Sequence, residues 1–183
     1  DDTNVLNNMS MTTKDFTEQK GYLERAYAKA PKDPEINMGL ALAKFGLGEL
    51  NEAHKHYSLR LDPSRSQRQH VHYTHELPIW DGSPLKGKTL FATCEQGIGD
   101  EVMFGSVLPI MYEEVEQLVI GVDRRLVSIF QRSFPDAIVC GYVDRVINGY
   151  RYRSFPEVQN LMKKGDLKID CASPFASITS YHW

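Results

Sequence analysis

The chain has 183 residues, of which 42% are hydrophobic and 25% charged, and its formal net charge is -3. These values are typical of a globular protein with one large or two small domains, and the acidic balance argues against a nucleic-acid-binding surface. No apolar run approaches the roughly 20 residues of a membrane-spanning helix, and the polar stretch 1–11 does not resemble a signal peptide. Three widely spaced cysteines, Cys94, Cys140 and Cys171, are expected to be buried free thiols of a cytoplasmic protein.

Residues 1–61 are predicted to be helical. Apolar residues at helical spacing predict a helix over 22–30, which stops at a proline. A second helix is expected over 33–45, with Pro34 in the first turn, where its missing N–H costs little. A third is expected over 49–61, after a break at two glycines.

This part of the chain resembles the tetratricopeptide repeat, a helical hairpin of about 34 residues. With Pro34 as the first position, the matching residues are Leu40, Ala41, Gly48, Leu50, Ala53 and Tyr57, preceded by Phe16, Leu23, Ala26 and Pro31 in the unit before. Gln19, Asn37 and Lys44 depart from the pattern. The resemblance covers about one and a half repeats and implies a groove for a peptide or protein partner, although stable arrays normally need about three repeats.

Residues 62–86 are expected to be a linker. His70, His72 and His75 raise the question of a metal site, but no carboxylate or cysteine shares their spacing, and a solvated connector is favoured. Trp80, between two prolines in an extended stretch, is expected to pack where the helical part docks on the next domain.

Residues 87–183 alternate between predicted strands and helices. Short apolar runs predict strands over 90–93, 118–122, 137–140 and 167–171, with helices over 101–114, 126–134 and 155–163 between them. Near-continuous apolar strands that alternate with helices indicate a parallel sheet covered on both faces. In the first of these helices the residues expected to face inward are Val102, Met103, Val107, Leu108 and Met111.

A tight turn follows the first of these strands. Gly97 and Gly99 allow the chain to reverse sharply and leave backbone amides open, and Asp100 is expected to be the N-cap of the next helix. Because ligands of open α/β sheets bind beyond the carboxyl ends of the strands, we expect a small-molecule site here, formed by Glu95, Gln96, Gly97, Gly99 and Asp100.

One interpretation of the turn is a degraded dinucleotide-binding fingerprint. It would use Gly97 and Gly99 for the pyrophosphate and Asp123, after the second strand, for a ribose. Val102 replaces the third glycine of that fingerprint, however, and Asp100 and Glu101 place negative charge where a pyrophosphate needs positive potential. This interpretation is therefore disfavoured.

The other interpretation follows from a second resemblance. The sequence Trp80-Asp81-Gly82-x-Pro84-Leu85-x-Gly87-Lys88-Thr89-Leu90, followed by Glu95-Gln96-Gly97-Ile98-Gly99-Asp100, resembles the junction in bacterial tetratricopeptide proteins fused to a glycosyltransferase domain. That domain is similar to the heptosyltransferases of glycosyltransferase family nine, which have the two-lobed GT-B fold. The segment 169–174 resembles the next strand and loop of that family.

The resemblance implies a fold class and a reaction. The expected architecture is tetratricopeptide hairpins over 1–61, a linker over 62–86 and a partial Rossmann-like parallel α/β domain over 87–183, half of a GT-B N-terminal lobe. Asp100 would be the general base toward the acceptor hydroxyl, and a nucleotide sugar would be the co-substrate, without a metal or other cofactor. Since the chain stops before a nucleotide-sugar lobe, we expect it to be inactive alone. A non-catalytic interaction scaffold is the alternative.

Self-association is also expected. The last predicted strand would leave an unpaired sheet edge, and the helical repeats would leave an open apolar end. Both features predict a homo-oligomer.

Overall fold

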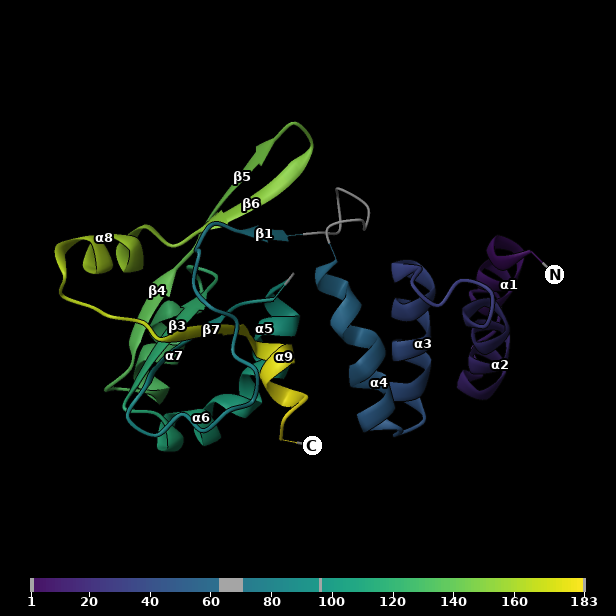
Figure 1. Ribbon diagram of the computed structural model, residues 1–183, viewed down its shortest axis with the longest axis horizontal. Coiled ribbons are helices and arrows are strands. Elements are labelled where there is room, and N and C mark those ends of the chain that lie inside the picture. The colour runs from purple at the N-terminus through teal and green to yellow at the C-terminus, as the bar shows by residue number, and fades with distance from the viewer. Residues whose placement is uncertain (1, 63–70, 96, 183) are drawn as a thin grey trace. The chain divides into compact units, whose positions relative to one another are not determined.

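The computed structural model describes residues 2–62, 71–95 and 97–182. They divide into two compact units, a helical unit before residue 71 and an α/β unit over Val71–His182 (Figure 1). The helical unit contains α1 (Thr3–Ser10), α2 (Phe16–Tyr27), α3 (Pro34–Gly46), α4 (Leu50–Tyr57) and the 3-10 helix η1 (Ser58–Leu61).

The helices of the first unit begin at aspartates. Asp2, Asp15 and Asp33 are the N-caps of α1, α2 and α3, and each side chain accepts a hydrogen bond from a free backbone N–H of its helix. Helices are confirmed over 33–45 and 49–61. The helix expected over 22–30 instead spans 16–27, because Asp15 caps it six residues earlier than its apolar pattern indicates. Helix α1 was not predicted.

Small and apolar side chains form the core of the helical unit. Its buried clusters contain Leu6, Ala26 and Ile36, and Leu23, Leu40 and Ala43. Asn37, which departs from the tetratricopeptide pattern, is also buried and polar. Its amide donates to the carbonyl oxygens of Pro31 and Asp33, and its Oδ1 lies 2.8 Å from Nδ1 of His56 in α4. A satisfied hydrogen-bond network therefore joins α3 to α4 at this position.

The α/β unit contains seven strands among its described residues. They are β1 (Val71–Tyr73), β2 (Thr89–Thr93), β3 (Gln117–Val122), β4 (Ile138–Gly141), β5 (Val143–Ile147), β6 (Tyr150–Ser154) and β7 (Cys171–Pro174). Its helices are α5 (Ile98–Phe104), η2 (Gly105–Val107), α6 (Leu108–Glu114), α7 (Val127–Ser133), α8 (Pro156–Lys164) and α9 (Phe175–Thr179).

Four strands form a parallel sheet in the order β4-β3-β2-β7. One face packs against residues of α6, α7 and α9, including Met111, Phe130 and Phe175. The other face packs against α8 and its flanks, including Phe155 and Val158. The predicted parallel sheet with helices on both faces is thus confirmed.

One strand of this sheet and one helix that packs on it have other bounds than the sequence predicts. The last strand is β7 rather than residues 167–171, because the backbone ladder begins only where Asp170 N–H donates to the carbonyl of Thr89. The helix expected over 101–114 is divided into α5, η2 and α6. Gly105 packs against the Phe130 ring at the break, and Pro109 cannot continue the helical hydrogen bonds.

The divided helix changes which side chains are buried. Val102 and Met103, expected to face inward, are 60% and 56% exposed. Val107, Leu108 and Met111 lie after the break and are buried as expected. The change in helical path at Gly105 is the physical reason, since one continuous apolar face cannot extend across it.

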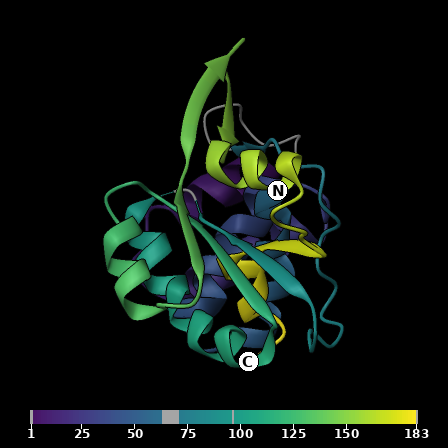
Figure 2. The ribbon, with the colours of Figure 1, turned by 90° about the vertical axis from the view of Figure 1, so that its left-hand side faces the viewer.

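The remaining strands form a second sheet in the order β1-β6-β5. The β5–β6 hairpin projects away from the parallel sheet (Figures 1 and 2). It turns at Asn148 and Gly149, whose φ angles of 52° and 83° are those of a tight hairpin turn. This hairpin was not among the elements predicted from the sequence.

The segment before β2 also belongs to the α/β unit. Ile79 forms a β-bridge with Ala172, so residues 78–80 cover the outer edge of β7. The expectation that the last strand leaves an unpaired edge was wrong. Trp80 is buried in the core of this unit, and its ring centroid lies 4.9 Å from that of Tyr181.

Candidate functional site

The glycine turn lies at the carboxyl edge of the parallel sheet, as the sequence predicts. It joins the end of β2 to α5. Gly97, not Asp100, is the N-cap of α5. Asp100 is half-buried in the first turn of the helix, with Gly97 beside its carboxylate. Gln96 lies outside the described residues, so its predicted role stays a prediction.

Glu95, expected to contact substrate, is directed into the protein. Its side chain is buried, and Oε1 accepts a hydrogen bond of 2.9 Å from the backbone N–H of Ala176 in α9. A carboxylate at the start of a helix satisfies free N–H groups there. Glu95 therefore connects the glycine turn to the element that follows β7.

Glu101 is a second buried acid at this edge. It is fully buried, and its Oε2 accepts a hydrogen bond of 2.7 Å from the backbone N–H of Asp123. Its Oε1 is also buried and has no hydrogen-bond partner among the described residues. Burial raises the pKa of Glu101 to about 7, which gives the site a carboxyl group that titrates near neutrality.

Asp123, at the end of β3, is held by two partners. Its carboxylate accepts hydrogen bonds of 2.9 Å from Nε and Nη2 of Arg125, and one of 3.2 Å from the hydroxyl of Tyr142. The Arg125 side chain is the main reason that the pKa of Asp123 is well below its usual range. Asp123 is thus ionised and engaged within the protein.

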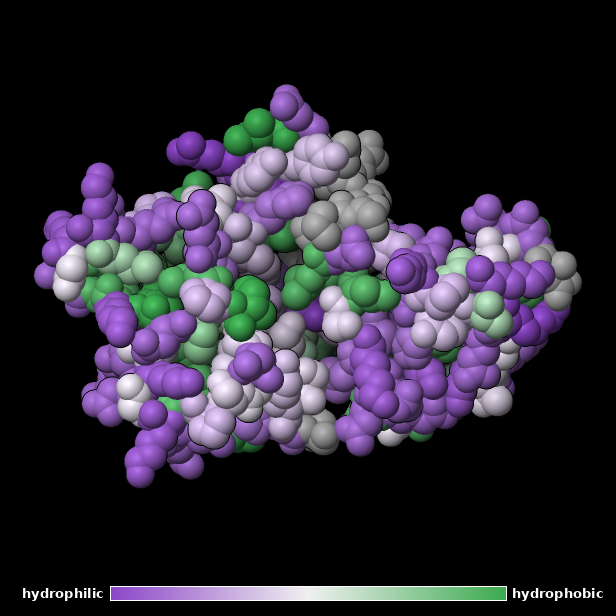
Figure 3. Space-filling view, in the orientation of Figure 1, coloured by the Kyte–Doolittle hydropathy of each residue, from purple (hydrophilic) through white to green (hydrophobic). Residues whose placement is uncertain are grey.

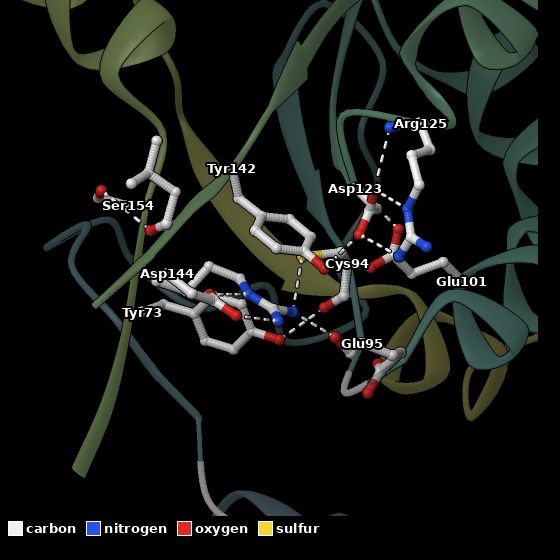
Figure 4. A network of polar contacts seen from close by, with 11 residues as sticks. Tyr73, Cys94, Glu95, Glu101, Asp123, Arg125, Tyr142, Asp144 and Ser154 are labelled. Carbon is white, nitrogen blue, oxygen red and sulfur yellow. Dashed lines mark hydrogen bonds and ion pairs between the residues drawn. The ribbon is translucent and has the colours of Figure 1, made fainter. Parts of the chain in front are cut away.

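Arg153 of β6 donates hydrogen bonds to Cys94, Glu95 and Asp144, three residues labelled in the polar network of Figure 4. It is buried, and its Nε and Nη2 donate to the two carboxylate oxygens of Asp144 at 2.8 and 3.0 Å. Its Nη1 donates to the backbone carbonyl of Glu95 and to Sγ of Cys94, at 3.2 Å for the sulfur. The guanidinium also lies 3.7 Å from the ring centroid of Tyr142. Arg153 therefore fixes the hairpin to the end of β2.

The roles of Arg153 and Glu101 were not predicted from the sequence. The hairpin had a recognisable signal, because Asn148-Gly149 separates two alternating stretches. Within that hairpin, Arg153 follows the alternation of tyrosine and arginine in 150–153. The burial of Glu101 had no such signal, since its environment depends on distant residues of β3 and β6.

The histidines do not form a metal site among the residues that the structure describes. His72 lies in β1 with its ring stacked on that of Tyr152, and His75 is half-buried with its ring in a T-shaped contact with that of Phe91. Burial lowers the pKa of His75. His70 lies outside the described residues. The three cysteines are buried and make no disulfide.

The fold and the site define a protein of mixed α and β class, in which a helical unit accompanies a parallel sheet with a polar network at its carboxyl edge. The chain is similar to Protein FlbA of Caulobacter vibrioides, with 32% identity over 144 residues, or 74% of this chain and 24% of that protein. The chain thus spans about a quarter of the length of this curated relative. No protein-family model matches the chain. Within the described segments, none of the helices has the length and apolar character needed to cross a membrane.

Proposed function

We propose that the chain is part of a tetratricopeptide-fused, glycosyltransferase-like protein. In this proposal the α/β unit is the acceptor-side, Rossmann-like lobe, and the helices bind a protein partner or the acceptor. The main supporting observation is the position of Asp100 and Glu101, directly after the glycine turn at the carboxyl edge of the parallel sheet.

Asp100 is the proposed general base. Its half-buried carboxylate would take the proton of an acceptor hydroxyl as that oxygen attacks the anomeric carbon of a nucleotide sugar. The bond from that carbon to the nucleoside diphosphate then breaks, and the diphosphate leaves with the bonding electrons. The buried Glu101 supports the turn from within.

The nucleotide sugar requires positive groups that are free to bind its diphosphate. Arg153 and Arg125, which belong to the polar network, are already paired with Asp144 and Asp123. A leaving diphosphate needs cations that are free to bind it. We therefore propose that the donor site lies in a second lobe. We expect no turnover by these 183 residues alone.

Two measurements on the 183-residue chain test this proposal. Release of nucleoside diphosphate from a panel of nucleotide sugars should stay at the buffer rate, and robust turnover would contradict the assignment to the acceptor side. In amide NMR spectra, neutral saccharides offered as acceptors should shift the signals of Gly97, Gly99 and Asp100, whereas free nucleoside diphosphates should not. Absence of any saccharide-dependent shift at this turn would overturn the acceptor-lobe proposal.

A non-catalytic interaction scaffold is the second candidate, and a pocket in the helical unit favours it. The pocket has a volume of about 210 Å³ and is lined by residues of α1, α2 and α3 and the turn after α1, including Met11 and Leu42, which are 75% and 55% exposed. Exposed apolar side chains in a helical groove are typical of peptide-binding surfaces. If this function is correct, a selected peptide should bind the chain, and Leu42→Asp should abolish that binding while Leu47→Asp, outside the pocket, should not.

A dinucleotide site has the weakest support. A ribose would need the carboxylate of Asp123 as an acceptor, but Arg125 and Tyr142 already donate to it. We therefore expect nicotinamide and flavin dinucleotides to leave the thermal unfolding temperature unchanged.

A further inference from the structure

One face of the β1-β6-β5 sheet carries a pocket that the proposed function does not use. Arg145 of β5 pairs with Tyr152 of β6, and Val143 pairs with Ser154, so alternate residues of these strands share a face. This face lines a pocket of about 180 Å³ that we call the hairpin pocket, formed by Thr74, Arg145, Ile147, Tyr152 and Ser154. Arg153, one residue from Tyr152, points from the opposite face toward the glycine turn.

The floor of the hairpin pocket is held in position. The ring of Tyr152 stacks on that of His72, with centroids 5.2 Å apart and planes 25° apart. The hydroxyl of Ser154 donates to the carbonyl of Val143 at 3.3 Å, and the hydroxyl oxygen of Thr74 accepts from Nε2 of Gln159 at 3.3 Å. Since these contacts fix the side chains before a ligand binds, little conformational entropy remains to be lost.

Arg145 gives the pocket an available positive charge. It is exposed and makes no hydrogen bond or ion pair with any residue in the described ranges, whereas Arg125 and Arg153 are each paired with a carboxylate. A guanidinium forms its strongest hydrogen bonds with planar anions such as carboxylates, because its N–H groups match both oxygens. The ligand that suits Arg145 is therefore one with an anionic group, which would form an ion pair with the guanidinium.

The other lining groups suit one small polar ring. An aromatic face such as that of Tyr152 can cover the apolar C–H face of a sugar, and Ile147, which is 52% exposed, extends the same apolar surface. Figure 3 shows apolar surface at the outer end of the hairpin. The hydroxyls of Ser154 and Thr74 can bond to ring hydroxyls. The pocket is smaller than the roughly 300 Å³ at which sites for drug-sized ligands begin, which favours a single ring over a nucleotide.

We propose that the hairpin pocket binds an acidic monosaccharide, with the sugar carboxylate on Arg145 and one ring face on Tyr152. The site is separate from the Asp100 edge, because the two faces of the hairpin point in opposite directions. It therefore does not depend on the proposed transferase function, and the two can fail separately.

The experiment measures binding of glucuronate to the whole chain by NMR titration, with glucose and acetate as matched ligands. Glucose has the ring without the carboxylate, and acetate has the carboxylate without the ring. We expect glucuronate to bind at least about tenfold more tightly than either and to shift the amide signals of Arg145, Tyr152 and Ser154.

Two variants of the same hairpin are compared. One removes the charge of Arg145, and the other, at Arg151, is the matched control. Arg145→Gln should weaken glucuronate binding by about tenfold or more, the usual effect of losing a charge-assisted pair. Arg151→Gln removes a charge from the opposite face and should change the affinity by less than about twofold, because Arg151 does not line the pocket. Equal losses in both variants, no preference over glucose and acetate, or tighter binding of an acidic peptide than of glucuronate would overturn the proposal.

Discussion

Glu101 shows how burial changes the chemistry of a single side chain. Its usual pKa of 4.5 rises to about 7 because the carboxyl group is buried, while the N–H of Asp123 and the charge of Arg153 oppose the rise. The folded protein therefore binds this proton more tightly than the unfolded chain does. A group of this kind adds most to stability at low pH, and its contribution is lost as the pH rises through the pKa of the folded state.

This linkage gives a prediction for Glu101→Gln. The free energy of unfolding of the wild-type protein should include a component that falls by roughly 3 kcal/mol between the two pKa values, 4.5 and about 7. In Glu101→Gln this component should disappear, because the amide does not titrate. Urea unfolding across this pH range measures it. The exposed Glu113→Gln is the control and should keep the wild-type slope, and an unchanged slope in Glu101→Gln would refute the assignment.

The β5–β6 hairpin is the element whose position depends most on one side chain. Arg153 contributes an ion pair with Asp144 inside the hairpin and hydrogen bonds to Cys94 and Glu95 outside it. These contacts join the second sheet to the carboxyl edge of the first. Any function at the glycine turn therefore depends on the hairpin being in place.

Replacing this arginine should loosen the hairpin without unfolding the parallel sheet. Arg153→Met leaves Asp144 unpaired and should lower the free energy of unfolding by about 3 kcal/mol. This value is at the lower end of the range for breaking a buried ion pair, because Asp144 is partly exposed. Hydrogen exchange should become faster across β5 and β6. Arg151→Met is the matched control, and protection equal to the wild type in Arg153→Met would contradict this role.

At the scale of the whole molecule, the two units have separate cores. Leu40 is buried in the helical unit and Leu118 in the α/β unit. We expect two unfolding transitions in calorimetry. Leu40→Ala should lower only one of them and Leu118→Ala only the other, each by about 2–5 kcal/mol of unfolding free energy. A single transition that both variants shift equally would show that the units unfold together.

Self-association stays a prediction, but its structural basis has changed. Residues 78–80 cover the edge of β7, and the exposed Asp144 and Arg145 discourage pairing along the edge of β5. The first helix of the helical unit has exposed apolar residues, with Val5 54% and Met9 40% exposed. If this surface pairs copies of the chain, sedimentation should show an oligomer that Val5→Asp dissociates. Ile110→Asp, on α6, should leave the oligomer intact, and a wild-type monomer would end the proposal.

Much of the architecture could be predicted because it depends on local patterns. The apolar runs of β2, β3 and β4, and the glycines after β2, specify strands and a turn through backbone preferences and burial. The same patterns located the edge at which Asp100 and Glu101 lie. They could not show that Gly97 rather than Asp100 caps α5, since cap geometry depends on where the helix begins.

The sequence by itself determined the alternation of strands and helices, the helices over 33–45 and 49–61 and the place of the glycine turn, because each depends on residues close in the chain. Only the tertiary structure decided the protonation of Glu101, the pairing of Arg153 and the closed edge of β7. Those features require residues such as Asp123, Asp144 and Ile79, which approach through packing and not through sequence proximity. Their electrostatic and hydrogen-bond energies exist only once the two sheets are assembled.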